Sequence, residues 1–226
     1  MTGPDAHLAL WLEGPLQSWG FQSRFDRRTT RTFPTRSGIV GLLAAALGVD
    51  RSDVPGLRRL DALRLTVYVC RNSGIATDFH TVGGGYGRTA DPRHIARTAD
   101  GNVGSTVVTR REYLQDAAFA VIAAGPVALV RDVGTALQDP HWGLWLGRRS
   151  CFPSVPVYQG EYPDEAEARA RLRTVAQARA RTVIRVVREV SDFAAGTDTL
   201  TDQPLDFAAR EFAPRRIADE LLEGGL

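Results

Sequence analysis

The sequence predicts an α+β fold: a ferredoxin-like (RRM-like) domain with an inserted β-hairpin and a smaller C-terminal subdomain. Two observations predict the domain. Segments with apolar residues at every second position, typical of strands, surround two segments with apolar residues at helical spacing. Their order along the chain is strand, helix, strand, strand, helix, strand, which is the split βαβ order of this fold. A third observation, a glycine-rich interruption between the second and third strands, predicts the hairpin.

The first strand and the first helix are bounded by residues with clear turn and cap preferences. Alternating residues over His7–Leu12 predict a strand that ends at a Gly-Pro pair. Residues 13–35 are mostly irregular. Thr35 or Ser37 can cap the helix that follows, because a hydroxyl accepts a hydrogen bond from a free amide of the first turn. Gly48 ends this helix, since glycine readily adopts the left-handed conformation of a C-terminal cap.

The rest of the pattern lies between residues 63 and 157. The second helix opens at Gly125-Pro126, carries apolar residues on one face and stops before Pro140. The predicted strands are Leu63–Cys70, Ala117–Ala124 and Val155–Val157. These elements predict one ferredoxin-like domain over residues 1–158.

Residues 75–112 form the interruption. Ile75–Val82 and Thr106–Glu112 alternate like the two legs of a β-hairpin. Between them, residues 83–105 contain six glycines and a proline, with no sustained periodicity. Such a composition buries too little apolar area to offset the entropy of ordering it. We therefore predict a hairpin whose tip is mobile in the free protein.

The tail, residues 159–226, is expected to form a smaller C-terminal subdomain. Asp164–Ala180 is rich in Ala, Glu and Arg and predicts a helix. Thr182–Val190 is rich in β-branched residues and predicts a strand.

Composition favours a globular protein of the cytoplasm. Hydrophobic residues make up 43% of the chain and charged residues 24%, which is ordinary for a folded domain. No apolar run is long enough to cross a bilayer, and the N-terminus does not resemble a signal peptide. Cys70 and Cys151 lack the spacing of a metal site, and we expect them to be reduced thiols.

The basic residues exclude several kinds of chemistry. All 28 are arginine, so the chain has no lysine for a phosphate-binding loop or a Schiff base. The four histidines are scattered along the sequence. We therefore expect no metal site, no cofactor and no catalytic residue.

Arginine also clusters, which favours a polyanionic partner. Arg24–Arg36 contains five arginines and one acid, Arg110 and Arg111 are adjacent, and Arg148–Arg149 follows a glycine. Such clusters are often only solvated surface. A planar guanidinium is nevertheless suited to bidentate phosphate contact and to stacking on bases. The Arg148–Arg149 pair is the strongest candidate, because no carboxylate lies near it in the sequence.

Five ordered motifs carry a resemblance to a known family. They are Leu12–Gly20 (LEGPLQSWG), Phe33–Leu43 (FPTRSGIVGLL), Asp78–Val82 (DFHTV), Arg111–Ala117 (REYLQDA) and Leu146–Cys151 (LGRRSC). Together they resemble the CasD subunits of type I-E CRISPR Cascade surveillance complexes, which belong to the RAMP superfamily. The resemblance implies a ferredoxin-like RAMP domain with an inserted β-hairpin thumb, in agreement with the interruption at 75–112.

The resemblance also implies a function. CasD subunits are non-catalytic: they hold the 5′ handle of the guide RNA, cap the complex and contact the large subunit CasA and the backbone subunit CasC. Target DNA is reached only through the complex, in antiviral defence. Single-stranded RNA is held by backbone charge and by stacking on aromatic or guanidinium planes. The candidate RNA-binding residues are Arg27, Arg28, Arg31, Arg36, Ser37, His80, Arg88, Arg110, Arg111, Tyr113, Arg148 and Arg149.

Two alternatives remain. A metal-independent endoribonuclease that processes CRISPR repeat RNA would need acid–base groups, for which His80, Tyr86, His94 or Tyr113 are candidates. The lysine used by a related enzyme is missing, which counts against it. A stand-alone RRM-like RNA binder would not explain the irregular 13–35 segment or the tryptophan-rich turn before Arg148.

Overall fold

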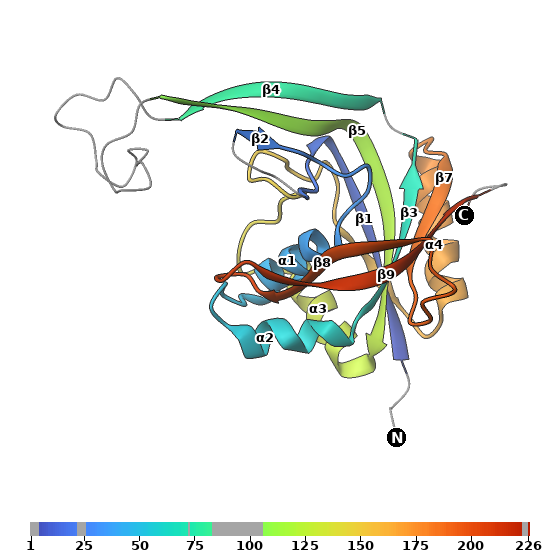
Figure 1. The fold of residues 1–226 in the computed structure, drawn as a ribbon. Helices are drawn as coiled ribbons and strands as arrows, with labels where there is room; N and C mark the ends of the chain where they lie inside the picture. Colours follow the sequence, from blue (N-terminus) through green and yellow to red (C-terminus); the bar gives the residue numbers. More distant parts are fainter. Residues whose placement is uncertain (1–4, 22–25, 72, 83–105, 223–225) are drawn as a thin grey trace.

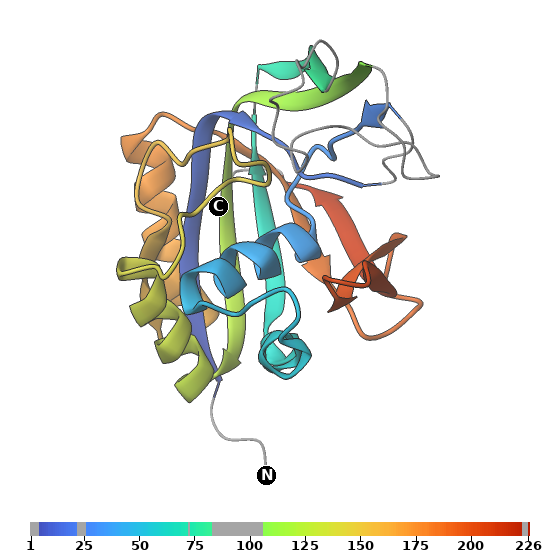
Figure 2. The ribbon, with the colours of Figure 1, turned by 90° about the vertical axis from the view of Figure 1, so that its left-hand side faces the viewer.

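The structure is a computed structural model that describes residues 5–21, 26–71, 73–82, 106–222 and 226. Their strands form one large, mostly antiparallel sheet in the order β6-β1-β5-β3-β7-β9-β8, and β2 and β4 also pair with β5. Helices cover both faces of this sheet (Figures 1 and 2). The elements are β1 (Asp5–Gln17), β2 (Arg27–Arg28), α1 (Arg36–Leu47), α2 (Val54–Arg59), a 3₁₀ turn (Leu60–Ala62), β3 (Arg64–Cys70), β4 (Gly74–Val82), β5 (Val107–Pro126), α3 (Val127–Gln138), β6 (Tyr158–Tyr162), α4 (Glu165–Ala178), β7 (Val183–Glu189), β8 (Asp198–Asp206) and β9 (Glu211–Leu221).

The predicted ferredoxin-like arrangement is confirmed. Strands β6, β1, β5 and β3 lie side by side in the order of the split βαβ fold, with α1 and α3 as its two helices. Thr35 is the N-cap of α1 and accepts a hydrogen bond from the Gly38 amide. Gly48 ends the helix in the left-handed conformation, with φ 74°. Of the two possible caps, Thr35 is therefore the one used.

Two predicted strand boundaries are wrong. The last strand of the pattern is Tyr158–Tyr162 and not Val155–Val157, because Pro156 has no amide hydrogen to donate to a ladder. The first strand continues through its Gly-Pro pair to Gln17. Proline is tolerated there because pairing with β6 ends at Leu10, which leaves β1 with β5 on one side only.

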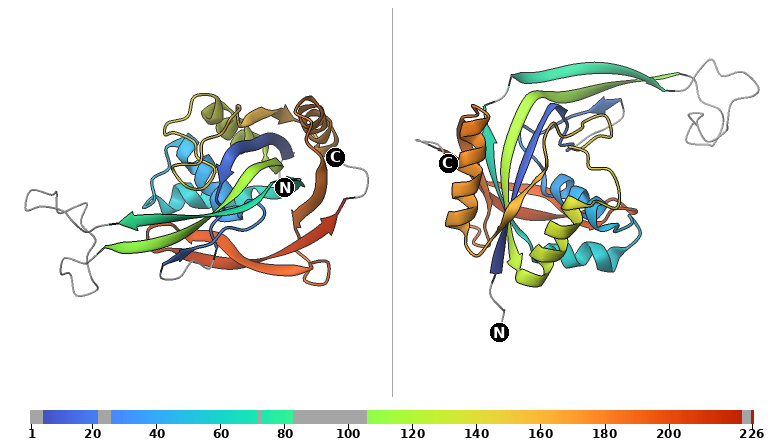
Figure 3. Two further views of the ribbon diagram at one scale, coloured as in Figure 1. Left: turned by 90° about the horizontal axis from the view of Figure 1, so that it is seen from above. Right: turned by 180° about the vertical axis from the view of Figure 1, so that it is seen from behind.

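Alternate side chains of β1 are buried in two apolar cores, one on each face of the sheet. Leu8, Leu10 and Leu12 pack with α1 and α3 on one face of the sheet. Ala9 and Trp11 pack with α4 on the opposite face. Figure 3 shows α4 and the other helices on opposite sides of the sheet. The central strands are therefore buried on both faces, which explains their long apolar runs.

The hairpin forms as predicted and arches over one end of the sheet (Figure 1). Strand β4 pairs with the first half of β5, from Gly74 opposite Gln115 to Val82 opposite Val107. The second leg is not a separate element, because β5 runs for 20 residues from the hairpin into the centre of the sheet. The glycine-rich tip at 83–105, with its predicted mobility, lies outside the described residues.

The C-terminal residues extend the same sheet. Strand β7 pairs antiparallel with β3, and β9 and β8 follow it. The helix and first strand expected in this region correspond to α4 and β7. Strands β8 and β9 and the short helix α2 were not predicted. The division of the chain into 1–158 and 159–226 stays a prediction. In the described part of the chain no helix is long and apolar enough to span a membrane.

Candidate nucleic-acid interface

Three arginine clusters that are far apart in the sequence meet at the base of the hairpin. Strand β2 pairs in parallel with β5, so that Arg27 lies opposite Arg110 and Arg28 opposite Arg111. The third cluster joins them, because Arg148 donates a hydrogen bond to the carbonyl oxygen of Arg28 over 2.8 Å. We define the arginine surface as Arg27, Arg28, Arg110, Arg111, Arg148 and Arg149.

Strands β2, β5 and β4 form a three-stranded ribbon. One face of this ribbon combines charge with an exposed aromatic ring. Residues that pair across strands share a face of the sheet, which places Arg27, Arg110 and Phe79 together. Phe79 is 63% exposed, and the Arg110 guanidinium lies 5.7 Å from its ring centroid. Arg110 also forms an ion pair with Asp26 over 3.0 Å.

Sequence reasoning missed Phe79, although a signal was present. Alternation puts Phe79 on the face opposite its neighbour His80. A hairpin that projects from its domain has no core beneath that face (Figure 1), so an apolar ring there is exposed. Exposed aromatic rings beside arginines can stack unpaired bases.

The opposite face is built around a paired histidine. His80 Nε2 lies 2.8 Å from the Asp78 carboxylate and 3.4 Å from the Tyr113 hydroxyl. Arg111 shares this face and donates from Nε to the Thr109 hydroxyl over 3.0 Å. The described contacts of the His80 ring therefore lie within the hairpin.

Arg148 and Arg149 differ in what they contact. Arg148 is half-buried and donates from Nη1 to the Glu112 carbonyl oxygen over 3.0 Å, in addition to its bond to β2. Its guanidinium lies 4.7 Å from the Tyr113 ring centroid, and Tyr113 is only 4% exposed. Tyr113, a candidate RNA-binding residue, therefore has little ring surface open to a base. Arg149 is exposed, 5.3 Å from the ring centroid of Trp145.

Arg31 and Ser37 line a separate cavity of about 300 Å³. The Arg31 guanidinium lies 4.5 Å from the ring centroid of Phe21 and 5.7 Å from that of Phe33. The cavity lies between the segment after β1, the start of α1 and strands β8 and β9. Its lining consists of Gly20, Phe21, Arg31, Ser37, Thr199, Thr201, Asp202 and Phe212.

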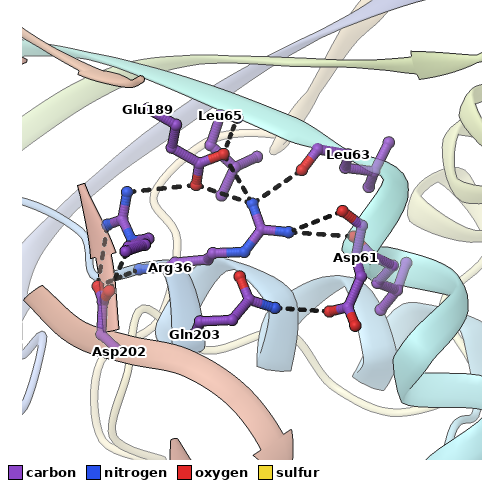
Figure 4. Close-up of polar contacts among 9 residues, drawn as sticks. Arg36, Asp61, Leu63, Leu65, Glu189, Asp202 and Gln203 are labelled. Carbon is purple, nitrogen blue, oxygen red and sulfur yellow. Dashed lines mark hydrogen bonds and ion pairs between the residues drawn. The ribbon is translucent and has the colours of Figure 1, made fainter. Parts of the chain in front are cut away.

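The expectation that Arg36 contacts RNA is wrong, because its side chain is buried in contacts within the chain. It is 3% exposed and donates from Nη1 to both carboxylate oxygens of Glu189, over 2.7 and 2.9 Å, and to the Leu63 carbonyl over 2.8 Å (Figure 4). The Arg36 amide donates to Asp202, which also binds Arg215. The Asp202 carboxylate thus lies at the N-terminus of α1, where the helix dipole favours a negative charge.

The two cysteines are buried in the apolar cores. Burial raises the pKa of the Cys70 thiol to about 12 and also raises the pKa of Cys151, so both thiols stay protonated at neutral pH. No group of three or more potential metal ligands is found among the described residues. Arg88, predicted from the sequence, lies outside them.

Comparison with known proteins identifies the family. The family model described as "CRISPR-associated protein (Cas_Cas5)" matches residues 7–218. A curated relative, "CRISPR system Cascade subunit CasD" of Escherichia coli (strain K12), is 33% identical over 167 residues, which cover 69% of this chain and 70% of the relative.

Solved structures agree with this assignment. A chain of a "CRISPR RNA-guided surveillance complex" superposes with a TM-score of 0.76 at 34% identity, covering 96% of this chain and 90% of that chain. A "Crystal structure of Cas protein" gives a TM-score of 0.65 at 33% identity, covering 96% and 94%. The resemblance to CasD inferred from the five motifs is thereby confirmed. The chain belongs to the Cas5 family of CRISPR-associated proteins.

Proposed function

We propose that this protein is a non-catalytic subunit of a type I-E Cascade complex. It holds the 5′ handle of the guide RNA, caps the complex and contacts the large subunit CasA and the terminal CasC subunit. Target DNA is reached through the assembled complex in the cytoplasm. The similarity to an E. coli Cascade subunit over most of both chains supports this assignment.

The observation that carries the RNA-binding proposal is the meeting of three arginine clusters at one place. Residues 27–28, 110–111 and 148–149 are adjacent through the β2–β5 pairing and the Arg148 side chain. Packing alone does not require several cations to lie side by side, because like charges repel each other. A polyanion that binds the exposed members of these clusters neutralises their charge and releases its own counterions.

Replacing Arg27 and Arg149 together by alanine should weaken binding of 5′-handle RNA and reduce its salt dependence. Both side chains are exposed and have no ion-pair partner among the described residues. Each lost phosphate contact lowers the salt slope by about 0.7 for a single strand, or about 1.4 for two. Between 50 and 200 mM salt, the wild-type affinity should then fall about sevenfold more than that of the variant. Fluorescence anisotropy across a salt series measures both quantities.

The control variant removes the same charge elsewhere. Arg51 and Arg131 are exposed arginines near α2 and on α3, at the end of the molecule opposite the hairpin (Figure 1). Arg51→Ala/Arg131→Ala should leave the slope unchanged within error. Equal slopes for the test variant and the control would contradict the placement of RNA on the arginine surface.

The purified protein should not cut CRISPR repeat RNA. The endoribonuclease alternative has one observation in its favour, the pairing of His80 with Asp78 beside Tyr113. The buried Tyr113 ring and the absence of lysine from the chain count against it. Incubation of labelled repeat RNA with EDTA, followed by gel analysis, tests this point. Site-specific cleavage by the wild type that disappears in His80→Ala would establish the nuclease instead.

A further inference from the structure

Arg148 lies where the two arginine-bearing strands meet. Its Nη1 donates to the Glu112 carbonyl oxygen on β5, and its Nη2 donates to the Arg28 carbonyl oxygen on β2. The planar guanidinium can serve two acceptors at once, which an ammonium group at the same position cannot do with the same geometry. Two of the Arg148 N–H donors are thus used to bridge the strands and cannot bind a phosphate at the same time.

Other contacts hold the residues on either side of strand β2. It is two residues long and pairs with β5 alone. The Arg110 amide donates to the Asp26 carbonyl oxygen just before β2, and the Thr30 amide after it donates to the Glu112 carboxylate over 3.2 Å. The exposed ion pair between Arg110 and Asp26 adds little, because water screens it. The Arg148 side chain adds hydrogen bonds that join the backbone of β2 directly to that of β5.

The turn that carries Arg148 is itself fixed to the core. The Leu146 and Cys151 side chains are fully buried, and the Leu146 amide donates to the Cys151 carbonyl over 2.7 Å. Gly147 has φ 95°, and a Cβ there would lie 1.8 Å from the Ser18 carbonyl oxygen. Only glycine fits this close approach. The turn thus presents Arg148 from a fixed position.

We propose that Arg148 is a positioning residue for the other arginines of the arginine surface. It holds β2 against β5, so that Arg27 stays beside Arg110 and Arg28 beside Arg111. Its effect on RNA binding passes through those four residues, and it does not itself contact a phosphate. The part of this inference that concerns RNA rests on the proposed function.

Hydrogen exchange in the RNA-free protein tests the bridging role. In Arg148→Ala, the Arg110 amide, which bonds to the Asp26 carbonyl, should exchange about tenfold faster, because two charge-assisted hydrogen bonds are lost. Arg148→Lys should show the same increase, since it keeps the charge but lacks the planar fork. Arg149→Ala is the matched control and should leave this amide unchanged. Unchanged exchange in both Arg148 variants would overturn the proposal.

Binding of 5′-handle RNA tests the functional consequence. Arg148→Ala should weaken binding about tenfold at constant salt, because the competent arrangement of β2 becomes less populated. Arg148→Lys should stay as weak as Arg148→Ala. A phosphate contact would behave differently, since lysine preserves the charge, and recovery of affinity in Arg148→Lys would overturn the proposal.

Hydrogen exchange and RNA binding together distinguish failure of this inference from failure of the proposed function. If the wild-type protein does not bind 5′-handle RNA at all, the proposed function fails. The exchange measurement needs no RNA and still decides whether Arg148 holds β2.

Discussion

Arg36→Ala should lower the free energy of unfolding by about 3–5 kcal/mol, the cost of leaving one partner of a buried ion pair uncompensated. The Arg36 side chain satisfies the Glu189 carboxylate and the carbonyls of Leu60, Asp61 and Leu63, and links α1 to β7. For a chain of this length the melting temperature should fall by roughly 6–20 °C. Urea unfolding followed by circular dichroism measures the change.

The control for this prediction is an exposed arginine. Arg51→Ala should change stability by no more than about 0.5 kcal/mol, as is usual for surface substitutions. Arg36→Lys should fall between the two, because it keeps the charge and loses the fork that reaches several acceptors. A stable Arg36→Ala variant with weakened RNA binding would contradict the structural role of Arg36 and restore the RNA contact first expected for it.

Glu13→Ala should be the second strongly destabilising substitution, by about 3 kcal/mol. Glu13 is 5% exposed and accepts hydrogen bonds from Trp11 Nε1 over 2.7 Å, from Arg181 Nη2 over 2.8 Å and from Arg179. Its loss would leave the indole donor and two cations without their buried acceptor. Because Arg179 and Arg181 are partly exposed, water relieves part of this cost. Thermal and urea unfolding at neutral pH test this value.

The pH dependence of stability tests the contribution of the Glu13 carboxylate independently. Burial raises the pKa of Glu13, but hydrogen bonds from Arg179, Trp11 and Arg181 outweigh it and hold the pKa below its ordinary value. The unfolded chain then binds a proton more readily than the folded protein, so stability rises with pH. The contribution is complete above the unfolded pKa and is lost as pH falls through the folded one.

Glu13→Gln is the matched variant for this titration. Glutamine keeps an acceptor oxygen at the same place but does not titrate. Between neutral pH and the acid range, its unfolding free energy should fall less steeply than that of the wild type. Parallel curves for the two proteins would show that Glu13 is not among the groups that control acid unfolding.

The features that sequence predicted correctly depend on residues close together in the chain. The Thr35 cap acts on an amide three residues away, and the Gly48 cap depends on its own backbone. Alternation identified both legs of the hairpin because the side-chain period of a strand is local. Strands β8 and β9 escaped prediction because their alternation is interrupted by Asp202, Pro204 and Pro214.

The candidate site shows where local reasoning stops. Arg27 and Arg36 belong to the same cluster and have the same chemistry, yet Arg27 is exposed and Arg36 is buried. The difference comes from Glu189, which lies 153 residues further along the chain and reaches Arg36 only after β7 has joined the sheet. No pattern within the cluster contains that information.

The sequence by itself determined the family, the order of the core elements, the hairpin insertion and the concentration of arginine in three clusters. Tertiary structure alone decided which arginines are buried and which are exposed. The acceptors of Arg148 lie 36 and 120 residues away in the sequence, and the carboxylate that Arg36 binds comes from Glu189 at the end of β7. The physical reason is that a buried polar group must be satisfied by whatever partner the fold brings to it. The choice of partner therefore belongs to the assembled sheet, which buries Arg36 and leaves Arg27 and Arg149 exposed.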